Sequence, residues 1–439
     1  MIPPVVLMVP AWGAAGVRRF TEIALPTLLA PGNLPSVNRR AVFLVWTRRE
    51  DWDDFASRPS VREAKRYAEF HPIFFQPSPL TESRHVTMSR GHRAMLGLAE
   101  RERAITVPVF ADSVFADGGL STLLSLAKPG RRMVMTLGLR IGEEAVREAF
   151  GFGKRVAVSI KPRELAAACA GELMHSQIRC WSAEEPAYGD DVLGGPWWRA
   201  APDGIVTHSI YWEPALIDFR FPWPHDASPV LDWTIDGHYS WWNLTRPEQY
   251  YVVTDSDEFL HVTTASEKEF GFSRRPMSGT IAEIWRRARE HPTTDPLRQA
   301  LCSARVYVHG SDIEGGGWRQ AEAKADAALE QSSVPTRERW TLRNRAFGNH
   351  VAGIGKDRAV VVVEGTTVIS VPREALKSMN FGKGDHFAAG VQPHENVEDA
   401  LAACGIGRNE PEPEPSTLPA ARVIVDQQRG KLYRSGLIK

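Results

Sequence analysis

Three acidic side chains within four residues form the densest group of potential metal ligands in the sequence. Asp255, Asp257 and Glu258 directly follow the run 249–254, which is typical of a short buried strand. If the strand continued, Asp255 and Asp257 would project from the same side, and two such carboxylates can chelate Mg²⁺ or Mn²⁺. A solvated turn, in which water screens the repulsion between the acids, explains the same spacing equally well.

A further acidic position, Asp112, follows the strand-like run 104–110. A carboxylate at the end of a parallel strand lies in the crevice above the sheet, where it can hold a divalent cation that neutralises a diphosphate. Asp112 and Asp117 are also candidates to cap the helix expected from Leu120 onward. We expect Asp117 to act as a cap, whereas both roles stay open for Asp112.

Aromatic residues are concentrated in the middle of the chain, where eight of the 14 tryptophans fall between Trp181 and Trp242. Aromatic rings beside carboxylates and imidazoles suit sugars, which present apolar faces with hydroxyl rims. Most of these tryptophans are expected in the core, because large aromatic side chains bury readily. The candidates for a sugar pocket are His208, Trp212, Trp241 and Trp242.

Asp236, His238 and Glu258 are the candidates for a general base toward a hydroxyl group. A positioned carboxylate or imidazole contributes about 10²–10⁴-fold to a rate. A structural role competes with catalysis for each of them, most of all for the lone histidine.

Two groups of arginines lie on segments with helical patterns. Arg90 and Arg93 can make charge-assisted contacts with phosphate oxygens, or can simply face solvent. Arg286, Arg287 and Arg289 would suit a peripheral contact with anionic lipid head groups. Because the formal net charge of the chain is zero, a solvated basic face is the preferred interpretation of the second group.

The elements that must position these residues begin with a wound α/β layer over about the first 140 residues, where short apolar runs alternate with amphipathic segments. The predicted strands are Val5–Val9, Ala41–Trp46, Pro72–Phe75, Ala104–Phe110 and Met133–Leu137. The predicted helices are Val17–Leu29, Val61–Phe70, Arg84–Arg101 and Leu120–Ala127. Right-handed crossovers would make the strands mostly parallel, with ligands at their carboxyl ends.

Four regions are expected along the chain: an α/β half over 1–150, an aromatic-rich half of the same domain over 151–275, a mostly helical region over 276–408, and an extended tail over 409–439. Further strands are expected at Gly204–Trp212 and Gln249–Thr254, and a hairpin at Arg358–Val363 and Thr367–Val371. Further helices are expected at Thr280–Glu290, Pro296–Val306, Arg319–Gln331 and Thr336–Phe347. The Glu-Pro alternation of Asn409–Pro419 should stay extended.

Composition excludes several classes of protein. Of the 439 residues 43% are hydrophobic and 24% are charged, which does not suit wholesale disorder, a collagen-like fibre or a multi-span membrane protein. The 53 basic and 53 acidic residues cancel, so the sequence offers no case for nucleic-acid binding. No apolar stretch approaches the roughly 20 residues needed to cross a bilayer.

Sequence motifs narrow the choice further. Four widely spaced cysteines do not form a disulfide scaffold or a paired zinc motif, and the start of the chain lacks a basic n-region, so we expect a cytoplasmic protein. The P-loop, the complete dinucleotide-binding loop, His-Glu-x-x-His and Gly-x-Ser-x-Gly are all absent from the sequence. ATPases, Rossmann dehydrogenases, zinc proteases and α/β hydrolases are therefore disfavoured.

The order of these elements resembles the GT-A fold of nucleotide-sugar glycosyltransferases over about the first 265 residues. The stretches Met88-Ser-Arg-Gly-His, Phe110-Ala-Asp-Ser-Val-Phe-Ala-Asp-Gly-Gly-Leu and Arg132-Met-Val-Met-Thr-Leu-Gly-Leu-Arg also resemble poorly characterised bacterial glycosyltransferases. The resemblance implies a GT-A-like wound mixed sheet flanked by helices. It also implies transfer of a sugar from a nucleotide-diphosphate donor to a glycan, lipid-linked or protein acceptor.

The same resemblance implies roles for particular residues. In this family an Asp-x-Asp pair at the end of the central strand binds Mn²⁺ or Mg²⁺ and the donor diphosphate. Asp112 matches the first acid by position, but Val114 stands where the second is expected; Asp255-Ser-Asp257 matches the motif literally but comes later in the chain. Either cluster can therefore be the metal site. The implied donor-binding residues are Pro10, Ala11, Trp12, Arg90, Arg93, Asp112 and Ser113.

Two other functions remain open. A glycoside hydrolase would use paired acids about 5–10 Å apart, which Asp232, Asp236 and Glu258 could supply. A non-catalytic glycan-binding or assembly protein could keep the fold without a metal pair, as Val114 suggests. The donor sugar, the acceptor and the oligomeric state do not follow from the sequence.

Overall fold

The computed structural model of the chain divides into two compact units, which we describe separately. Unit 1 comprises Met1–Pro77, Ala94–Pro224 and Asn243–Pro335, and unit 2 comprises Ser78–Arg93, His225–Trp242 and Thr336–Lys439. The structure describes residues 3–75, 84–179, 181–184, 187–188, 195–209, 212–221, 223, 235, 239–244, 247–266, 275–276, 280–290, 296–332, 350–354, 358–363, 367–372, 392–394, 397–404, 422–426 and 431–435.

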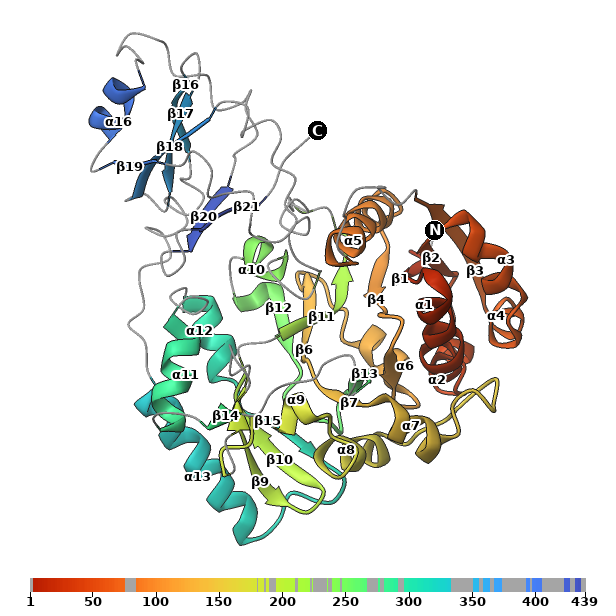
Figure 1. The fold of residues 1–439 in the computed structure, drawn as a ribbon. Coiled ribbons are helices and arrows are strands. Elements are labelled where there is room, and N and C mark those ends of the chain that lie inside the picture. Colours follow the sequence, from red (N-terminus) through yellow and green to blue (C-terminus); the bar gives the residue numbers. More distant parts are fainter. Residues whose placement is uncertain are drawn as a thin grey trace. The chain divides into compact units, whose positions relative to one another are not determined.

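Seven strands form the main sheet of unit 1, in the order β12, β6, β11, β4, β1, β2 and β3 (Figure 1). All of them run in one direction except β11, which is antiparallel to its neighbours β4 and β6. The strands are β1 (Val5–Pro10), β2 (Ala41–Thr47), β3 (Ala68–Phe74), β4 (Ile105–Pro108), β6 (Met133–Leu137), β11 (Trp212–Asp218) and β12 (Tyr250–Val252). The carboxyl ends of the six parallel strands therefore lie along one edge, which is where open α/β sheets bind ligands.

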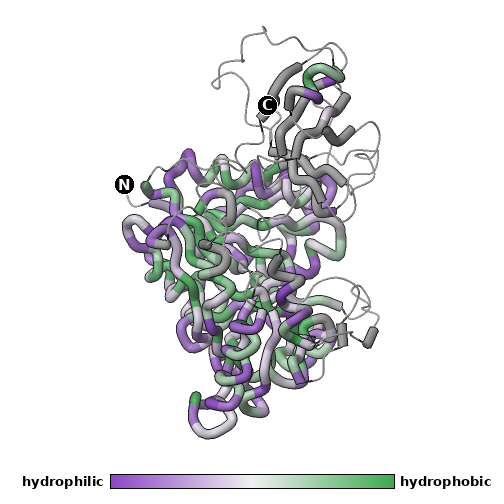
Figure 2. The backbone as a smooth tube through the Cα atoms, turned by 90° about the vertical axis from the view of Figure 1, so that its left-hand side faces the viewer, coloured by the Kyte–Doolittle hydropathy of each residue, from purple (hydrophilic) through white to green (hydrophobic). Residues whose placement is uncertain are grey.

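The centre of this sheet is buried on both faces. Every residue of β1 and β2 is buried, which explains why both strands are almost continuous apolar runs. Val5, Leu7 and Val9 alternate along β1 and therefore point to the same face of the sheet. There they pack into one core with Phe20 and Leu25. Hydrophilic stretches are frequent at the outer turns of the described chain (Figure 2).

Helices occupy most of the connections of unit 1. The helical segment between β1 and β2 is continuous and consists of α1 (Gly13–Arg19), the π turn η1 (Phe20–Ala24) and α2 (Leu25–Leu28). The others are η2 (Leu34–Ser36), η3 (Arg49–Asp51), α3 (Trp52–Ser57), α4 (Pro59–Ala64), α6 (Gly119–Ser125), α7 (Glu143–Phe150), α8 (Pro162–Ala170), α9 (Ser176–Arg179), η5 (Pro247–Gln249), α11 (Ile281–Glu290), α12 (Pro296–Ser303) and α13 (Gly316–Gln331). Helices α5 (Arg84–Arg101) and α10 (Tyr239–Asn243) contain residues of both units.

Three small sheets complete unit 1. One has the order β15, β10, β9, another β5, β13, β7, and a third pairs β14 with β8. Their strands are β5 (Ser113–Phe115), β7 (Arg140–Gly142), β8 (Ala187–Tyr188), β9 (Trp197–Ala201), β10 (Gly204–Thr207), β13 (His261–Ala265), β14 (Arg275–Pro276) and β15 (Val306–His309). Helix α13 packs on β9 and β10 through an alanine stripe that meets Trp198 and Val206.

Unit 2 contains a four-stranded antiparallel sheet, a helix against that sheet, and a separate hairpin. The sheet has the order β16, β17, β18, β19, and α16 contacts all four strands. The elements are β16 (His350–Ile354), β17 (Arg358–Val363), β18 (Thr367–Pro372), β19 (Gln392–His394), α16 (Val397–Ala403), β20 (Arg422–Asp426) and β21 (Lys431–Ser435). The predicted hairpin is thus confirmed as β17 and β18.

The predicted α/β layer is confirmed as a mixed α/β architecture with a large, mostly parallel sheet flanked by helices. Two of the predicted helices extend too far. The helix predicted over Val61–Phe70 ends at Ala64, because β3 begins at Ala68 and pairs along its whole length with β2. The helix predicted over Pro296–Val306 ends at Ser303, because Val306 opens β15 beside β10.

The region 276–408, predicted to be mostly helical, is mixed: its described residues include strands β15 to β19 as well as helices. The predicted helix Thr336–Phe347 and the extended run Asn409–Pro419 lie outside the described residues. None of the described helices combines the length and the apolar character that a membrane span needs.

Candidate functional site

Both acidic clusters follow the carboxyl ends of parallel strands of the main sheet. Asp112 comes four residues after β4, and Asp255 comes three residues after β12. Strands β4 and β6 run in the same direction because both are antiparallel to β11, and β12 is parallel to β6. The two clusters therefore belong to the same edge of the sheet.

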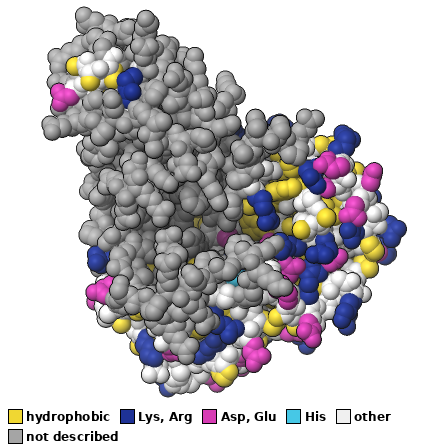
Figure 3. Space-filling view, viewed as in Figure 1, with side chains coloured by type: hydrophobic (Ala, Val, Ile, Leu, Met, Phe, Trp, Pro, Cys, Tyr) yellow, Lys and Arg dark blue, Asp and Glu magenta, His cyan; other side chains and the backbone are white. Residues whose placement is uncertain are grey.

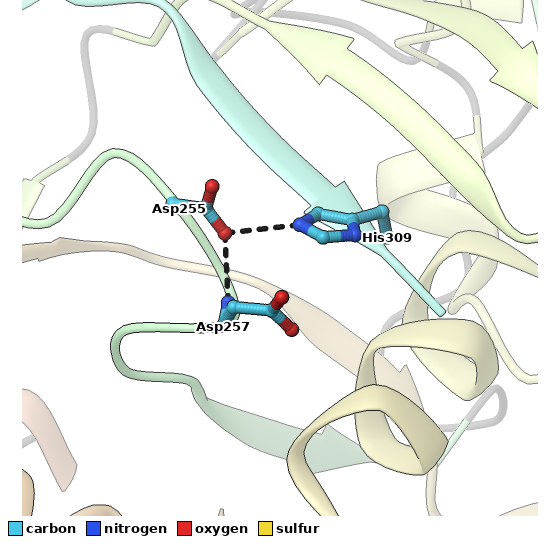
Figure 4. A group of neighbouring side chains, drawn as sticks. All are labelled: Asp255, Asp257 and His309. Carbon is cyan, nitrogen blue, oxygen red and sulfur yellow. Dashed lines mark hydrogen bonds and ion pairs between the residues drawn. The ribbon is translucent and has the colours of Figure 1, made fainter. Parts of the chain in front are cut away.

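Asp255 and Asp257 are joined by a residue that the sequence did not single out, His309 at the end of β15 (Figure 4). One ligand atom from each of the three residues lies within 4.8 Å of the other two. The carboxylates are about 40% exposed, whereas the imidazole is buried with 3% of its side chain exposed. The group thus combines two accessible acids with one buried and fixed nitrogen.

The hydrogen bonds of His309 define which ring nitrogen faces the acids. Nδ1 lies 2.7 Å from the carbonyl oxygen of Ser311, and a carbonyl only accepts, so Nδ1 carries a proton. Nε2 then faces Oδ1 of Asp255 at 3.0 Å. Two lone pairs cannot face each other at this distance without a positive charge, so either a proton or a metal ion belongs between them. A backbone carbonyl on the second nitrogen is also the usual support of a metal-binding histidine.

Strand β15 fixes the acidic loop through its backbone. The amide of Tyr307 donates to the carbonyl of Thr254 at 2.9 Å, and the amide of Ser256 donates to the carbonyl of Tyr307 at 3.0 Å. Ser256 is buried, and its Oγ accepts a hydrogen bond from the amide of His309 at 3.1 Å. The residue between the two aspartates therefore sets the position of the histidine relative to both of them.

The turn after His309 packs tightly against helix α8. A Cβ added to Gly310 would lie 2.6 Å from Cβ of Ala167 and 3.1 Å from the carbonyl oxygen of Arg163. A glycine is therefore required for the close approach of this turn to the first turns of the helix.

Arg163, in the first turn of α8, provides a basic partner to the cluster. Its Nη2 lies 2.8 Å and its Nε 3.0 Å from the two carboxylate oxygens of Asp257, and its Nη1 lies 2.6 Å from Asp312. These contacts raise the pKa of Arg163 and lower the pKa of Asp257. The acids of the loop thus have counter-ions from two different elements.

The donor set fits a divalent cation of intermediate hardness. Carboxylates and an imidazole together suit Mn²⁺ and related ions, and two acids balance a charge of +2. Asp255, Asp257 and His309 would hold the ion, and open positions would remain on the exposed side of the two acids. Metal binding by Asp255 and Asp257 stays a prediction. The structure adds His309 as a third possible ligand beside them.

Asp112 has a different environment. Its backbone carbonyl accepts from the amide of Thr264 in β13, and burial raises the pKa of its carboxyl group, with Arg140 and Arg19 acting in the opposite direction. Val114 is fully buried in β5 opposite Val262. The described surroundings of Asp112 thus offer arginines and no second carboxylate in an Asp-x-Asp pattern.

The capping role expected of Asp117 is wrong. Its carboxylate accepts from the amide of Gly32 and the hydroxyl of Ser159, while α6 has Gly118 at its N-cap. The first turn of α6 is instead capped by Asn33, whose Oδ1 accepts from the amide of Leu120 at 2.8 Å.

The other donor-site candidates lie near the ends of β1 and β4. Pro10 closes β1, Ala11 is buried with its amide on the carbonyl of Trp46, and Trp12 is partly exposed. The ring of Trp12 meets Phe75 edge to face at 5.7 Å. The buried hydroxyl of Ser113 accepts a hydrogen bond from a backbone amide.

Two candidates for the sugar pocket, His208 and Trp212, are buried and so do not form an exposed platform for a sugar. Trp212 is 1% exposed, and its indole donates to the carbonyl of Ser209. His208 is also 1% exposed, with Nδ1 at 3.1 Å from the carbonyl oxygen of Ala304, and burial lowers its pKa. Both have the geometry of core residues, and their role toward an acceptor stays a prediction.

Glu258, a candidate base, is partly exposed and accepts a 2.6 Å hydrogen bond from the hydroxyl of Tyr251. Asp236 and His238 lie outside the described residues. Trp241 and Trp242 belong to α10, but their side chains are likewise not described. Arg90 and Arg93 belong to α5 in unit 2.

Two cavities occur in the described part of unit 1 away from these acids. The larger, of about 280 Å³, lies beside the start of α7 and is lined by Gly142, Glu144, Ala145, Glu172, Leu173, Met174, Ser176 and Arg179. The smaller is lined by residues of β6, β9 and β10 together with Ile178 and Trp181. Neither includes Asp112 or the acids at 255–258, of which Asp257 is exposed and the others are partly buried.

His309 and Arg163 were not predicted as site residues. The sequence gives no local signal for either, because His309 is 54 residues from Asp255 and Arg163 is 94 residues from Asp257. A correct prediction of strand β15 would have pointed to His309, because the polar end of this strand lies beside the acidic loop.

Comparisons with known proteins give no family. No model of a protein family matches the sequence, and no curated protein matches it. Among solved structures, a protein named as a glucose-1-phosphate thymidylyltransferase from Bacillus anthracis, in complex with a sucrose, is similar at a TM-score of 0.20 and 16% identity over 33% of this chain. GalNAc-T7 with UDP, GalNAc and Mn²⁺ is similar at a TM-score of 0.31 and 10% identity over 84% of this chain.

The chain spans 57% of the length of the thymidylyltransferase and 64% of the length of GalNAc-T7. TM-scores of 0.20 and 0.31 are too low to indicate the fold or the activity of this chain. The proposal below therefore depends on the residues and the geometry of the chain itself.

Proposed function

We propose that the chain is a metal-dependent, GT-A-like glycosyltransferase. It would move a sugar from a nucleotide-diphosphate donor to a hydroxyl of a glycan, a lipid-linked acceptor or a protein. The observation that carries the proposal is the convergence of Asp255, Asp257 and His309 after the carboxyl end of a parallel strand. This edge of an open α/β sheet is where ligands bind, and the donor set suits Mn²⁺ or Mg²⁺.

The residues of the cluster would divide the work of the reaction. A bound divalent cation would supply neutralisation of the charge that develops on the departing diphosphate. Asp255, Asp257 and His309 would hold that cation, and Ser256 would fix the position of His309 relative to the two aspartates. Glu258, whose carboxylate is oriented by Tyr251, would accept the proton of the acceptor hydroxyl.

An aromatic group supports a donor site at the same edge. Trp46, at the end of β2, stacks on Phe75 at 4.9 Å, and Trp12 meets the same ring after the end of β1. The indole nitrogen of Trp46 is buried and has no hydrogen-bond partner within the described residues. Trp46 and Phe75 are themselves buried, whereas the ring of Trp12 is partly exposed and could stack on a nucleobase, which is consistent with the proposed contact of Pro10, Ala11 and Trp12 with the donor.

Thermal shift with a panel of nucleoside diphosphates, each with and without Mn²⁺, tests the proposal. Binding to the native state alone at about 100 times Kd should raise Tm by about 5 °C. We expect one nucleotide to give such a shift, and only when Mn²⁺ is present. No shift for any nucleotide at saturating concentration would contradict the proposal.

Two substitutions in the same assay decide between the acidic clusters. Asp257→Asn should abolish the Mn²⁺-dependent part of the shift, since it removes one ligand. Asp112→Asn should leave that part in place, because Val114 stands where the second acid of an Asp-x-Asp pair would be. The opposite pattern would move the metal site to Asp112.

A further inference from the structure

Each acid of the candidate metal centre has a basic partner of its own. Asp255 faces His309, and Asp257 is held by the guanidinium of Arg163 through both carboxylate oxygens. This pairing relieves the repulsion that neighbouring acids would otherwise experience. The guanidinium thus occupies the oxygens with which Asp257 would bind a cation.

We propose that Arg163 is a built-in competitor of the divalent cation: it holds Asp257 in the metal-free protein and is displaced when the cation binds. The proposal rests on the proposed function, because it concerns the same carboxylates. Displacement is favoured because a guanidinium and a divalent cation on one carboxylate repel each other. Arg163 thereby sets the cation concentration at which the centre fills.

Asp312 gives the displaced guanidinium a place to go. Nη1 of Arg163 already contacts Asp312 at 2.6 Å while Nε and Nη2 hold Asp257. The Arg163 side chain is 45% exposed and that of Asp312 is 70% exposed. The guanidinium can therefore rotate toward Asp312 through solvent. The exchange at Asp257 requires a change of side-chain rotamer at Arg163.

The backbone that carries Arg163 is fixed at both ends of α8. The amide of Lys161 donates to Glu164 at the first turn, and the guanidinium of Arg199 donates to the carbonyl of Ala170 at the last turn. The close contact of Gly310 with the carbonyl of Arg163 adds a third restraint. The exchange is therefore confined to the side chain of Arg163.

Binding of Mn²⁺ alone to the full chain, measured by electron paramagnetic resonance at low ionic strength, tests this proposal. Arg163→Lys keeps the charge but removes the two-pronged contact, so it should tighten Mn²⁺ binding about threefold. Arg163→Gln removes the charge as well and should tighten binding about tenfold. Arg40→Lys is the matched control, because Arg40 makes a similar fork with Glu69 at the amino end of β2, and it should leave Mn²⁺ binding unchanged.

Each outcome decides the question. Tighter binding in both Arg163 variants and unchanged binding in the control supports the competitor role. Equal affinity in the wild type and both Arg163 variants overturns this role and leaves the metal centre intact. Tightening in Arg163→Gln alone, with Arg163→Lys at wild-type affinity, reduces Arg163 to a general charge effect and also overturns it. Absence of Mn²⁺ binding in every variant overturns both this role and the metal-dependent function.

Discussion

His309 is the residue on which the proposed metal centre depends most, because its imidazole is buried and oriented by the Ser311 carbonyl. His309→Gln should weaken Mn²⁺ binding at least about tenfold, since even partners outside the ligand shell cost 10- to 100-fold. The measurement is a titration of free Mn²⁺ against each protein.

His71→Gln is the control for this titration. His71 is exposed on β3 and paired with Glu69, so its loss should leave Mn²⁺ binding unchanged. Equal affinities of the two variants would show that His309 has only a structural role.

His261 predicts how the stability of the protein depends on pH. Its ring is buried between Phe115 and Phe259, and burial lowers its pKa from 6.5 to about 4 despite a carboxylate oxygen of Glu213 at 3.7 Å. Below pH 6.5 the unfolded chain binds a proton at this residue, while the folded chain does not until about pH 4. The stability contribution of neutral His261 is therefore present above pH 6.5 and is lost as the pH falls.

His261→Phe should remove this dependence. Between pH 7 and pH 5 the free energy of unfolding of the wild type should fall by about 2 kcal/mol more than that of the variant. Urea denaturation at the two pH values measures the difference. Parallel losses in both proteins would mean that His261 is already protonated, or accessible, in the folded state. Buried His92, with a pKa lowered to about 3, acts in the same direction in both proteins.

At the level of elements, one buried side chain connects three segments of unit 1. Asn33 is fully buried; its Nδ2 donates to the carbonyls of Thr27 and Ala116, and its Oδ1 caps α6 at Leu120. Asn33→Ala leaves these groups without partners and should cost roughly 3 kcal/mol of stability. The matched control, exposed Ser36→Ala, should cost no more than about 0.5 kcal/mol. Similar losses in the two variants would refute the role of Asn33.

The elements differ in how well the sequence predicted them. Strands β1, β2 and β6 were predicted almost to the residue, because strands buried on both faces are continuous apolar runs. Two short strands were not predicted: β5, of three residues, and β15, of four residues directly after a helix. Runs this short have no hydrophobic pattern that distinguishes them from the flanking segments. The cap of α6 could not be predicted either, since Asn33 is 87 residues away from Leu120.

The candidate site shows the same limit. The sequence identified Asp255 and Asp257 because they adjoin each other at a strand end. It could not identify His309 or Arg163, whose approach depends on the pairing of β15 with the acidic loop and on the packing of α8. Local patterns thus indicated the two acids as candidates, and long-range packing places His309 and Arg163 beside them.

At the level of the whole molecule, the described surface mixes acidic and basic side chains, in line with 53 residues of each charge (Figure 3). The described side chains on the face shown in Figure 3 therefore form no broad field of one sign that would concentrate a nucleotide near the protein. Recognition of an anionic donor must depend on local groups, of which the proposed cation is the strongest.

Crystals of the full chain soaked in Mn²⁺ and measured at the manganese absorption edge test the central claim most directly. We expect an anomalous peak in bonding contact with Asp255, Asp257 and Nε2 of His309, with the guanidinium of Arg163 turned away toward Asp312. An unoccupied centre at saturating Mn²⁺, or a peak at Asp112 instead, would contradict it.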